Sequence, residues 1–224
     1  MTDIHTHILY SFDDGADNID ISIDMLEEQR RQSIDTVILT PHYDPHEAAL
    51  DSFCEIRQNR LNNLLKYTDI KLIAASETYF SNALLHMTTI LPLCIGNSRD
   101  ILIELPFGCR LDKVLLMQLE NLIGKYCVRP IIAHVERTRI LHQIGGLDKL
   151  HDIGCLVQVN CEFAQRNIKS VTKLIKLGRI DYLASDCHNM DSRPPCLGDT
   201  LHMLDTEAAE ILKENIDNLI INKR

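Results

Sequence analysis

The stretch DIHTH, residues 3–7, places two histidines one residue apart near the start of the chain. The run from Asp3 to Thr6 predicts a short strand, which His7 follows directly. Because side chains alternate between the two faces of a strand, His5 and His7 point to the same side. Two imidazoles side by side suit a divalent cation, and a hydrogen-bonded pair without an ion is the alternative.

Apolar, β-rich runs recur along the rest of the chain, with helical patterns between them. Continuous Val/Ile/Leu runs of this kind indicate the buried strands of a parallel sheet that is covered on both sides. Apolar residues three and four apart predict helices over 18–32, 112–126, 170–178 and about Thr206 to Ile221. The seven predicted strands are Asp3–Thr6 and the runs TVILTPH (36–42), KLIAASE (71–77), DILIELP (100–106), PIIAHVE (130–136), CLVQVNC (155–161) and DYLASDCH (181–188).

Seven βα units in 224 residues predict a single α/β domain over residues 1–224, and they favour a closed barrel over an open sheet. Eight strands would be the more familiar count for such a barrel. No Ser/Gly-rich linker divides the chain, and no internal repeat accompanies the βα rhythm. The last predicted helix is expected to close the barrel, with contact to a partner as the alternative.

The bulk composition excludes several classes of function. The formal net charge is −9 and no Lys/Arg run compensates for it locally, so nucleic acid binding is not expected. The first residues lack a basic segment followed by an apolar one, and no run of about 18 apolar residues occurs. We therefore expect a cytoplasmic protein without membrane insertion. The eight cysteines follow no CxxC spacing, and most are expected to be reduced core residues.

Ionisable side chains gather at the ends of the predicted strands, where parallel barrels carry their chemistry. A carboxylate at the end of an apolar strand is costly unless it is paired or binds a metal. Five histidines and four carboxylates are therefore candidate metal ligands: His5, His7, His42, His134, His188, Asp14, Glu77, Glu104 and Asp186. The other histidines are expected on the surface or satisfied in the core: His46, His86, His142, His151 and His202.

The segments DIHTHIL with FDDG, TPH, ASE, IELPF, AHVER and SDCHN with SRPP resemble, in order, motifs of the polymerase and histidinol phosphatase (PHP) superfamily. Within it, the chain resembles the bacterial tyrosine phosphatases encoded with capsule and exopolysaccharide genes. The resemblance implies a distorted seven-stranded (β/α)7 TIM-like barrel with three metal ions at its carboxyl rim. It implies His5, His7, Glu77 and Asp186 as ligands of one ion, Glu77, Glu104 and His134 of a second, and Asp14, His42 and His188 of the third, while Asp13 shapes the turn. Two segments depart from the family's pattern, Tyr10–Ser11 and Thr78–Tyr79, and they are expected to alter loop shape more than metal binding.

The resemblance also implies an activity, the hydrolysis of phosphotyrosine on the tail of a bacterial tyrosine kinase that regulates capsule or exopolysaccharide synthesis. We hypothesise that two ions sharing Glu77 activate a bridging hydroxide for in-line attack on phosphorus. Arg137 and Arg193 have planar donor forks that suit a phosphoryl group, as catalytic and substrate-binding residues, with surface salt bridges as the alternative. Mn²⁺ is the favoured ion, with Fe²⁺ and Zn²⁺ as alternatives. A tyrosyl leaving group has a pKa of about 10 and needs no dedicated general acid.

Other interpretations stay open from the sequence. The nearest is a PHP-type phosphatase for a small molecule such as histidinol phosphate, and another is a non-catalytic metal-binding scaffold. Amidohydrolases share the HxH segment but commonly use a modified lysine where this chain has Glu104. Cys187 and Arg193 match the C-x5-R signature of cysteine-dependent phosphatases, but the loop between them lacks glycine and Asp186 disfavours a thiolate.

Overall fold

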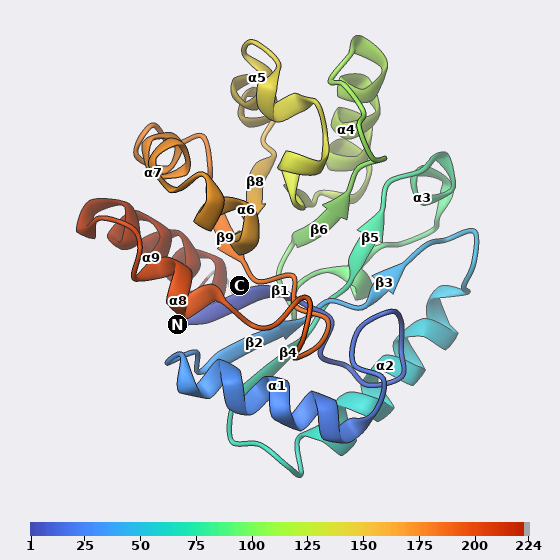
Figure 1. The fold of residues 1–224 in the computed structure, drawn as a ribbon. Helices are drawn as coiled ribbons and strands as arrows, with labels where there is room; N and C mark the ends of the chain where they lie inside the picture. Colours follow the sequence, from blue (N-terminus) through green and yellow to red (C-terminus); the bar gives the residue numbers. More distant parts are fainter. Residues whose placement is uncertain (222–224) are drawn as a thin grey trace.

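The computed structural model describes residues 1–221 and places the strands at the centre of the molecule with helices around them (Figure 1). The strands are β1 (Thr2–Thr6), β2 (Thr36–Leu39), β3 (His42–Tyr43), β4 (Lys71–Ala74), β5 (Glu77–Tyr79), β6 (Asp100–Glu104), β7 (Arg129–Ile132), β8 (Leu156–Asn160) and β9 (Tyr182–Ala184). The α-helices are α1 (Ile19–Arg31), α2 (Leu50–Leu64), α3 (Asn82–His86), α4 (Lys113–Tyr126), α5 (Gly146–Asp152), α6 (Cys161–Arg166), α7 (Ile168–Lys176), α8 (Leu197–Leu201) and α9 (Thr206–Ile221). Three short 3-10 helices lie in the connections: η1 (Leu91–Leu93), η2 (Val135–Arg137) and η3 (Ile140–His142).

The strands pair in parallel, as the sequence predicts. β1, β2 and β4 form one sheet, and β3, β5, β6, β7, β8 and β9 form a second. The two sheets meet where β1 runs beside the end of β9. There His7 N donates to Cys187 O at 2.9 Å, and Asp186 N donates to His5 O at 2.9 Å. The fold is therefore α/β with a curled parallel sheet.

Two predicted strands are interrupted, so residues 1–221 contain nine strands where the sequence predicted seven. The second predicted strand breaks between β2 and β3 at Pro41, which has no N–H group for a sheet hydrogen bond. The third breaks between β4 and β5: Ala75 N still donates to Leu39 O at 2.9 Å, but Glu77 joins the other sheet. In that sheet, His42 of β3 lies opposite Glu77 of β5 in the parallel register.

An irregularity in β1 decides which way its side chains point. The register of β1 against β2 shifts between Asp3 and Thr6, as it does in a β-bulge. Because of the bulge, Ile4 packs in a buried apolar cluster inside the sheet. The next residue, His5, also points inward and contacts the buried Glu77. His5 and His7 lie together on this side, as the alternation along the strand predicts.

The predicted helices correspond to α1, α4, α7 and α9, with small shifts of their ends. Asn18 caps α1 by accepting hydrogen bonds from two backbone N–H groups, and Asp112 caps α4 by accepting one from Leu115 N. The sequence patterns did not indicate α2, because its buried face includes Arg57, which breaks the apolar pattern. Among the described residues, no helix combines the length and hydropathy that crossing a membrane requires.

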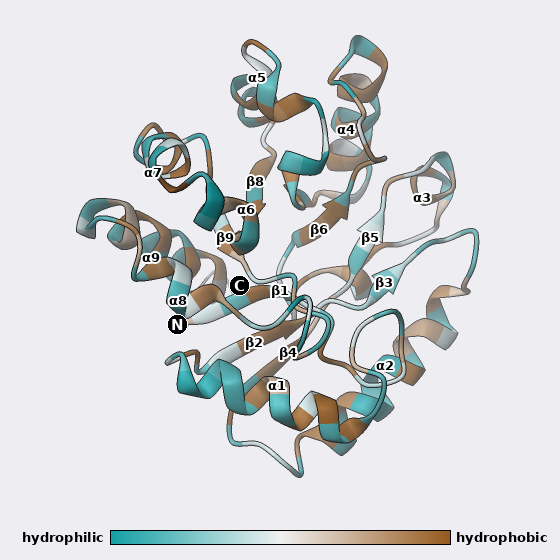
Figure 2. Ribbon diagram, in the orientation of Figure 1, coloured by the Kyte–Doolittle hydropathy of each residue, from teal (hydrophilic) through white to brown (hydrophobic). Residues whose placement is uncertain are grey.

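Two apolar clusters hold the layers together. The larger lies between the strands and the surrounding helices, and Figure 2 shows hydrophobic residues along β2 and β6 but mixed residues along α1. The smaller, which we call the inner core, consists of Ile4, Ile38, Ala75, Ile95, Leu102, Ile131, Ala133, Tyr182, Ala184, Ile216 and Leu219. The last two residues come from α9. This helix therefore covers the inner core.

Candidate metal centre

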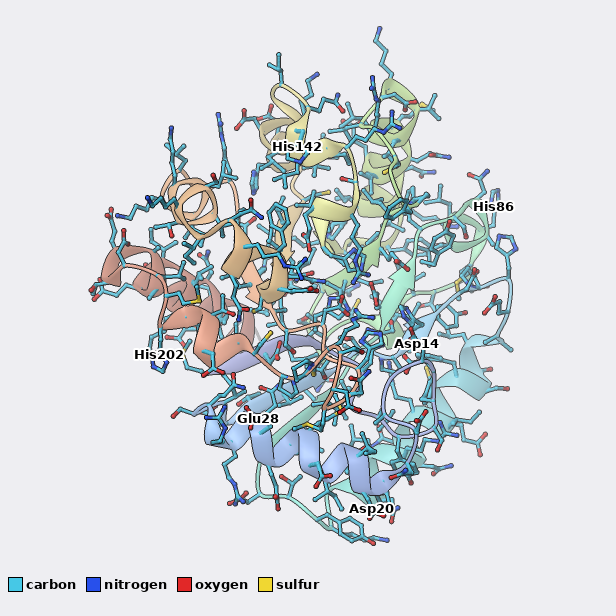
Figure 3. All side chains as sticks on the ribbon, in the orientation of Figure 1. Asp14, Asp20, Glu28, His86, His142 and His202 are labelled. Carbon is cyan, nitrogen blue, oxygen red and sulfur yellow. The ribbon has the colours of Figure 1, made fainter. Side chains whose placement is uncertain are left out.

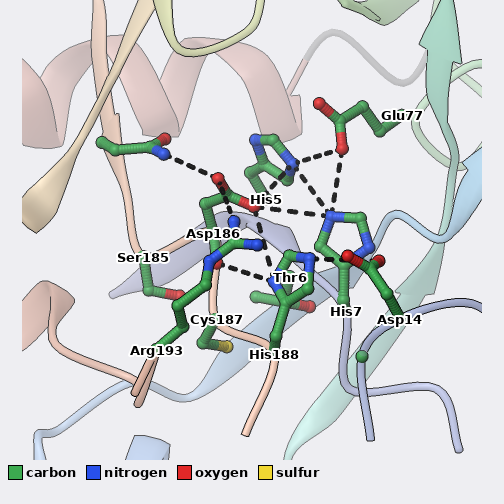
Figure 4. A network of polar contacts seen from close by, with 12 residues as sticks. His5, Thr6, His7, Asp14, Glu77, Ser185, Asp186, Cys187, His188 and Arg193 are labelled. Carbon is green, nitrogen blue, oxygen red and sulfur yellow. Dashed lines mark hydrogen bonds and ion pairs between the residues drawn. The ribbon is translucent and has the colours of Figure 1, made fainter. Parts of the chain in front are cut away.

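Four predicted ligands meet in the interior at the carboxyl ends of the strands (Figure 4). His5 Nε2 lies 3.0 Å from Glu77 Oε2 and 3.4 Å from Asp186 Oδ1. His7 Nε2 lies 3.1 Å and 3.5 Å from the same two oxygens, and 3.2 Å from His5 Nε2. All four side chains are buried. The HxH segment of β1 thus converges with carboxylates from β5 and from the end of β9.

The spacing of these atoms fits a bound cation. Donor atoms about 2.1 Å from one ion lie about 3.0–3.4 Å apart at octahedral or tetrahedral angles. The distances of 3.0 to 3.5 Å between the imidazole nitrogens and the carboxylate oxygens match that range. Glu77 Oε2 and Asp186 Oδ1 are also buried without a hydrogen-bond partner, which is costly unless a cation balances them. The donor set therefore fits a divalent ion.

A second group lies beside the first and consists of Asp14, His42 and His188, with His7 in reach. His42 Nε2 and His188 Nε2 each lie 3.3 Å from Asp14 Oδ1. His188 Nε2 is buried without a hydrogen-bond partner, so its lone pair is available to a cation. Asp14 is exposed near the centre of the view in Figure 3. These are the three residues that the resemblance implies for the third ion.

A third group differs in one member from the implied set. His42, Glu77 and Glu104 offer ligand atoms within 4.8 Å of one another, where the resemblance implied His134 with the two carboxylates. His134 Nε2 lies 2.5 Å from Glu77 Oε1 and 3.8 Å from Glu104 Oε1. His42 Nδ1 lies 3.2 Å from Glu77 Oε2. Glu77 therefore contacts four histidines, namely His5, His7, His42 and His134. The structure thus brings all nine predicted metal ligands together.

Local backbone features hold these side chains in place. Ala16 N donates to His7 O at 3.0 Å, and a Cβ atom on Gly15 would lie 2.1 Å from the same oxygen, so only glycine lets the FDDG loop pass there. His134 and Asp186 have φ angles of +28° and +51°, which L residues seldom adopt. Such strain persists where the surrounding structure enforces it, and here it occurs at two candidate ligands.

Asp13 has a larger role than the predicted turn. Its Oδ1 accepts a hydrogen bond from Gly15 N at 3.0 Å, as the turn requires. Its Oδ2 lies 2.7 Å from His7 Nδ1 and accepts from His42 N at 2.9 Å. A carboxylate on the far nitrogen of a metal-binding histidine fixes the ring and its tautomer. Asp13 therefore orients a ligand, which its place beside Asp14 in the sequence did not reveal.

Gln158 and Asn160 of β8 also position ligands, although neither was a predicted site residue. Gln158 Oε1 accepts from His134 N at 2.7 Å and lies 3.3 Å from His5 Nδ1. Asn160 Nδ2 donates to Asp186 Oδ2 at 2.6 Å. Two polar residues on one face of the apolar run CLVQVNC were the signal that could have indicated them.

Arg137 and Arg193 reach the same carboxylate oxygen. Their Nη2 atoms lie 2.7 Å and 2.6 Å from Asp186 Oδ2. Their side chains are 35% and 30% exposed, so both guanidinium groups border the ligands and still meet solvent. The backbone holds Arg193 in place, because His188 N donates to Arg193 O at 2.9 Å. Both arginines thus form ion pairs, and their common partner Asp186 is buried.

Burial and charge move the pKa values of the site in opposite directions. Burial lowers the pKa of His7, but Asp13 and Glu77 outweigh it and raise that pKa to about 10. Burial alone would raise the pKa of Glu77, but the charge of His5 helps to hold it well below its ordinary value. Burial raises the pKa of Glu104, and the charge of Glu77 adds to the effect. The neighbouring carboxylates thus favour the protonated forms of His5 and His7.

The remaining histidines lie away from this centre, as predicted. His46, His86, His142 and His202 are exposed, and Figure 3 shows the last three at the periphery. His151 Nε2 lies 2.7 Å from Asp181 Oδ2.

Cys187 does not have the surroundings of a catalytic thiolate. It is fully buried, and its Sγ lies 3.9 Å from Gln29 Nε2. Burial raises the pKa of its thiol well above the ordinary value. Arg193, its partner in the C-x5-R match, contacts Asp186 instead. The cysteine-dependent mechanism therefore finds no support in the structure.

The two unusual segments are anchored outside the ligands. Arg60 of α2 donates to Ser11 O, and its guanidinium carbon lies 5.8 Å from the centre of the Tyr10 ring. Thr78 Oγ1 lies 2.8 Å from Ser76 Oγ, and both residues are buried. These contacts fix the two segments, and the candidate metal ligands beside them still converge.

A curled parallel sheet with histidines and carboxylates at its carboxyl ends is a framework that metal-dependent hydrolases use. Residues 1–222 match the family model described as capsular polysaccharide synthesis, CpsB/CapC, and the chain belongs to this family.

Similar proteins extend over most of the chain. The tyrosine-protein phosphatase YwqE of Bacillus subtilis is 29% identical, over 100% of this chain and 92% of its own length. The tyrosine-protein phosphatase CpsB of Streptococcus agalactiae is 23% identical over 99% of both chains. CpsB of Streptococcus pneumoniae is 28% identical, over 87% of this chain and 86% of its own.

Solved structures agree with this assignment. The fold matches one from a study of YwqE from Bacillus subtilis and CpsB from Streptococcus pneumoniae, described as unique metal-dependent tyrosine phosphatases, with a TM-score of 0.84. That match has 27% sequence identity and covers 100% of this chain and 96% of the other. The phosphotriesterase from Mycobacterium tuberculosis shares the fold alone, with a TM-score of 0.53 and 12% identity over 96% of this chain and 87% of its own.

Proposed function

We propose that this protein is a metal-dependent phosphatase that removes phosphate from phosphotyrosine on proteins. The observation that carries the proposal is the convergence of nine histidines and carboxylates with two arginines at one end of the sheet. The three relatives described above by sequence, YwqE and two CpsB proteins, are named tyrosine-protein phosphatases. A phosphatase for histidinol phosphate or another small molecule is therefore not favoured.

The nine candidate ligands would hold three divalent ions, in the groupings described above. Mn²⁺ is the favoured ion, with Fe²⁺ and Zn²⁺ as alternatives, because carboxylates and imidazoles together suit all three. Bound ions would activate water for attack on phosphorus and neutralise the phosphoryl oxygens.

Arg137 and Arg193 would bind the phosphoryl oxygens of the substrate. Each guanidinium group carries five N–H donors, and Asp186 Oδ2 engages only part of them. The remaining donors can form paired hydrogen bonds with a phosphate dianion. Because a tyrosyl leaving group has a pKa of about 10, it departs without a dedicated acid, and we assign none.

A more specific description of the fold belongs to the same proposal. We propose that residues 1–224 form one domain on a distorted seven-stranded (β/α)7 barrel. β2 with β3, and β4 with β5, would each count as one strand, which reduces nine strands to seven. The backbone hydrogen bonds of His5 with Asp186 and of His7 with Cys187 support closure between β1 and β9.

The physiological substrate would be the phosphotyrosine-bearing tail of a bacterial tyrosine kinase that regulates capsule or exopolysaccharide synthesis, in the cytoplasm. The family's description, capsular polysaccharide synthesis, supports this choice.

Glu77→Ala tests the metal centre. We expect the variant to lose bound metal and at least about 10³-fold of its kcat/KM on a phosphotyrosine peptide, because this one carboxylate serves two of the ligand groups. Metal analysis and chelator-sensitive hydrolysis are the measurements. The control is Glu47→Ala, at an exposed position outside the centre. Full activity in Glu77→Ala would disprove the shared carboxylate.

Arg193→Gln separates phosphate binding from metal binding. We expect the metal content to stay near that of the wild type, while kcat/KM falls by about 10²–10³-fold, the cost of removing a preorganised donor. The control is Arg166→Gln, whose arginine pairs with Glu162 at the surface of α6. Loss of metal together with activity would assign Arg193 a purely structural role.

A further inference from the structure

We infer that the loops after β6 and β7 form a second anion subsite beside the metal centre, which binds a second phosphorylated side chain of the peptide substrate. Arg110 and Arg139, which we call the arginine pair, would be its ligands. The inference rests on the proposed function and names the class of peptide that the enzyme prefers.

The arginine pair differs from every other arginine in residues 1–221. The others each contact a carboxylate or a backbone carbonyl: Arg30, Arg31, Arg57, Arg60, Arg99, Arg129, Arg137, Arg166, Arg179 and Arg193. The side chains of Arg110 and Arg139 are exposed and make no hydrogen bond or ion pair with any residue that the structure describes. Two unpaired guanidinium groups in a protein of net charge −9 indicate an anionic ligand.

The arginine pair lines one cavity of about 360 Å³, together with Thr138, His142 and Gln143. This volume lies in the range of about 300–1,000 Å³ that is typical of ligand pockets, and it exceeds what a single carboxylate fills. Two guanidinium groups match the charge of a phosphate, about −1.5 to −2, better than that of a carboxylate. A phosphorylated side chain is therefore the occupant that the site favours.

The aromatic ring of such a side chain has an apolar surface within reach. Arg110 also lines a neighbouring cavity of about 400 Å³, whose wall includes Phe80, Pro106 and Leu115. The ring can lie against this wall while its phosphate meets the arginine pair. Asp112 borders the same cavity, but its carboxylate is occupied in capping α4, where it accepts from Leu115 N at 2.9 Å.

Hydrogen bonds between the two loops hold the arginine pair near the metal centre. Arg139 N donates to Cys109 O at 2.8 Å, which places the two loops side by side. The Gln143 side chain accepts from Leu111 N at 3.1 Å and donates to Leu111 O at 2.9 Å. Because these hydrogen bonds lie within the protein itself, they order the two loops independently of a bound peptide. Gly108 N of the loop after β6 donates to Arg137 O at 3.0 Å, and Arg139 follows Arg137 by two residues, so the subsite adjoins the segment that carries Arg137.

The position of the subsite fits a short spacing along the peptide. An extended peptide advances about 3.3–3.6 Å per residue. Since three extended residues span up to about 11 Å, the proposal predicts a second phosphorylated residue within about three positions of the hydrolysed phosphotyrosine.

The test uses the metal-loaded protein and a set of peptides with one phosphotyrosine. Each peptide carries, at one position within three residues of it, a phosphonate analogue of phosphotyrosine, a glutamate or an unmodified tyrosine. The phosphonate cannot be hydrolysed, and nonproductive binding does not change kcat/KM. We expect at least one phosphonate peptide to have a kcat/KM about tenfold above its tyrosine counterpart, as one charge-assisted hydrogen bond predicts.

The double variant Arg110→Gln/Arg139→Gln should lower this ratio to about 1, whereas Arg30→Gln on the exposed surface of α1 should leave it unchanged. Fluorescence anisotropy of labelled peptides gives the same ratio for binding, so a protein without turnover still tests the subsite. A ratio that survives in the double variant would overturn the inference, and so would glutamate peptides that match the phosphonate ones. Loss of hydrolysis of every peptide by the wild type would instead contradict the proposed function.

Discussion

The two ends of the curled sheet bury different kinds of side chain. At the carboxyl ends, imidazoles and carboxylates face one another, and three of their buried atoms, Glu77 Oε2, Asp186 Oδ1 and His188 Nε2, have no hydrogen-bond partner. The inner core next to them holds mainly aliphatic side chains from the same strands, covered by α9. Burial of apolar side chains in the inner core stabilises the fold. This stabilisation offsets the cost of burying polar groups at the carboxyl ends, where they are arranged for a ligand.

The boundary between these regions falls within β1. Ile4 belongs to the inner core, and His5, the next residue, belongs to the candidate metal centre. A regular strand would send these two side chains to opposite faces, and the bulge between Asp3 and Thr6 brings them to one side. The residues that stabilise the fold and those that carry the chemistry are therefore separated along the strands and not between domains.

Asp13→Asn tests how Asp13 orients the metal ligands at the carboxyl ends of the strands. The amide keeps an oxygen for Gly15 N but loses the negative charge that faces His7 Nδ1 at 2.7 Å. Removing such a partner of a metal-binding histidine typically costs about 10–100-fold in metal affinity, and we expect that loss here. Titration of the metal-free protein with Mn²⁺ measures it.

Asp17→Asn, at an exposed position of the same loop, serves as the control and should bind metal like the wild type. Wild-type affinity in Asp13→Asn would mean that Asp13 only shapes the turn.

Much of this polar end could be predicted from the sequence, because strand ends are local features. A histidine or carboxylate that closes an apolar run, as Glu77 does in ASE, is visible without knowing what lies beside it. The parallel arrangement then brings such residues to one rim. The same reasoning indicated Arg137 and Arg193 as residues that follow strand ends, and in the structure both contact Asp186.

The residues that support the ligands could not be predicted in this way, since their role depends on distant contacts. Gln158 meets His5 across 153 positions of the chain, and nothing near either residue indicates the pairing. The break between β4 and β5 arises because Glu77 pairs in the other sheet, which is a tertiary effect. The bulge in β1 likewise leaves no mark in the alternation of DIHTH.

Ile216→Val tests the apolar end. Removing one buried methylene from α9 should lower the free energy of unfolding by about 1 kcal/mol, within the usual range of about 0.5–1.5 kcal/mol for this change. Metal content and kcat/KM should not change, because the side chain lies in the inner core and touches no ligand group. Denaturant unfolding and metal analysis measure both effects. A fall in metal affinity would show that the two ends are coupled.

His151→Gln gives the smallest effect and compares a histidine of the opposite end with those of the metal centre. The hydrogen bond that His151 Nε2 donates to Asp181 Oδ2, 2.7 Å away, raises the pKa of His151 above its ordinary value of 6.5. Because the folded state holds this proton more tightly than the unfolded one, the pair stabilises the fold fully below pH 6.5. That contribution disappears as the pH rises from there through the raised pKa. We expect it to be at most about 1 kcal/mol, because both groups are partly exposed and screened.

The measurement is the difference in unfolding free energy between wild type and variant from about pH 5.5 to 8.5, with chelator present so that metal binding does not contribute. A difference that stays constant with pH would show that His151 is not charged in the fold, whereas a decline toward high pH assigns it the ion pair.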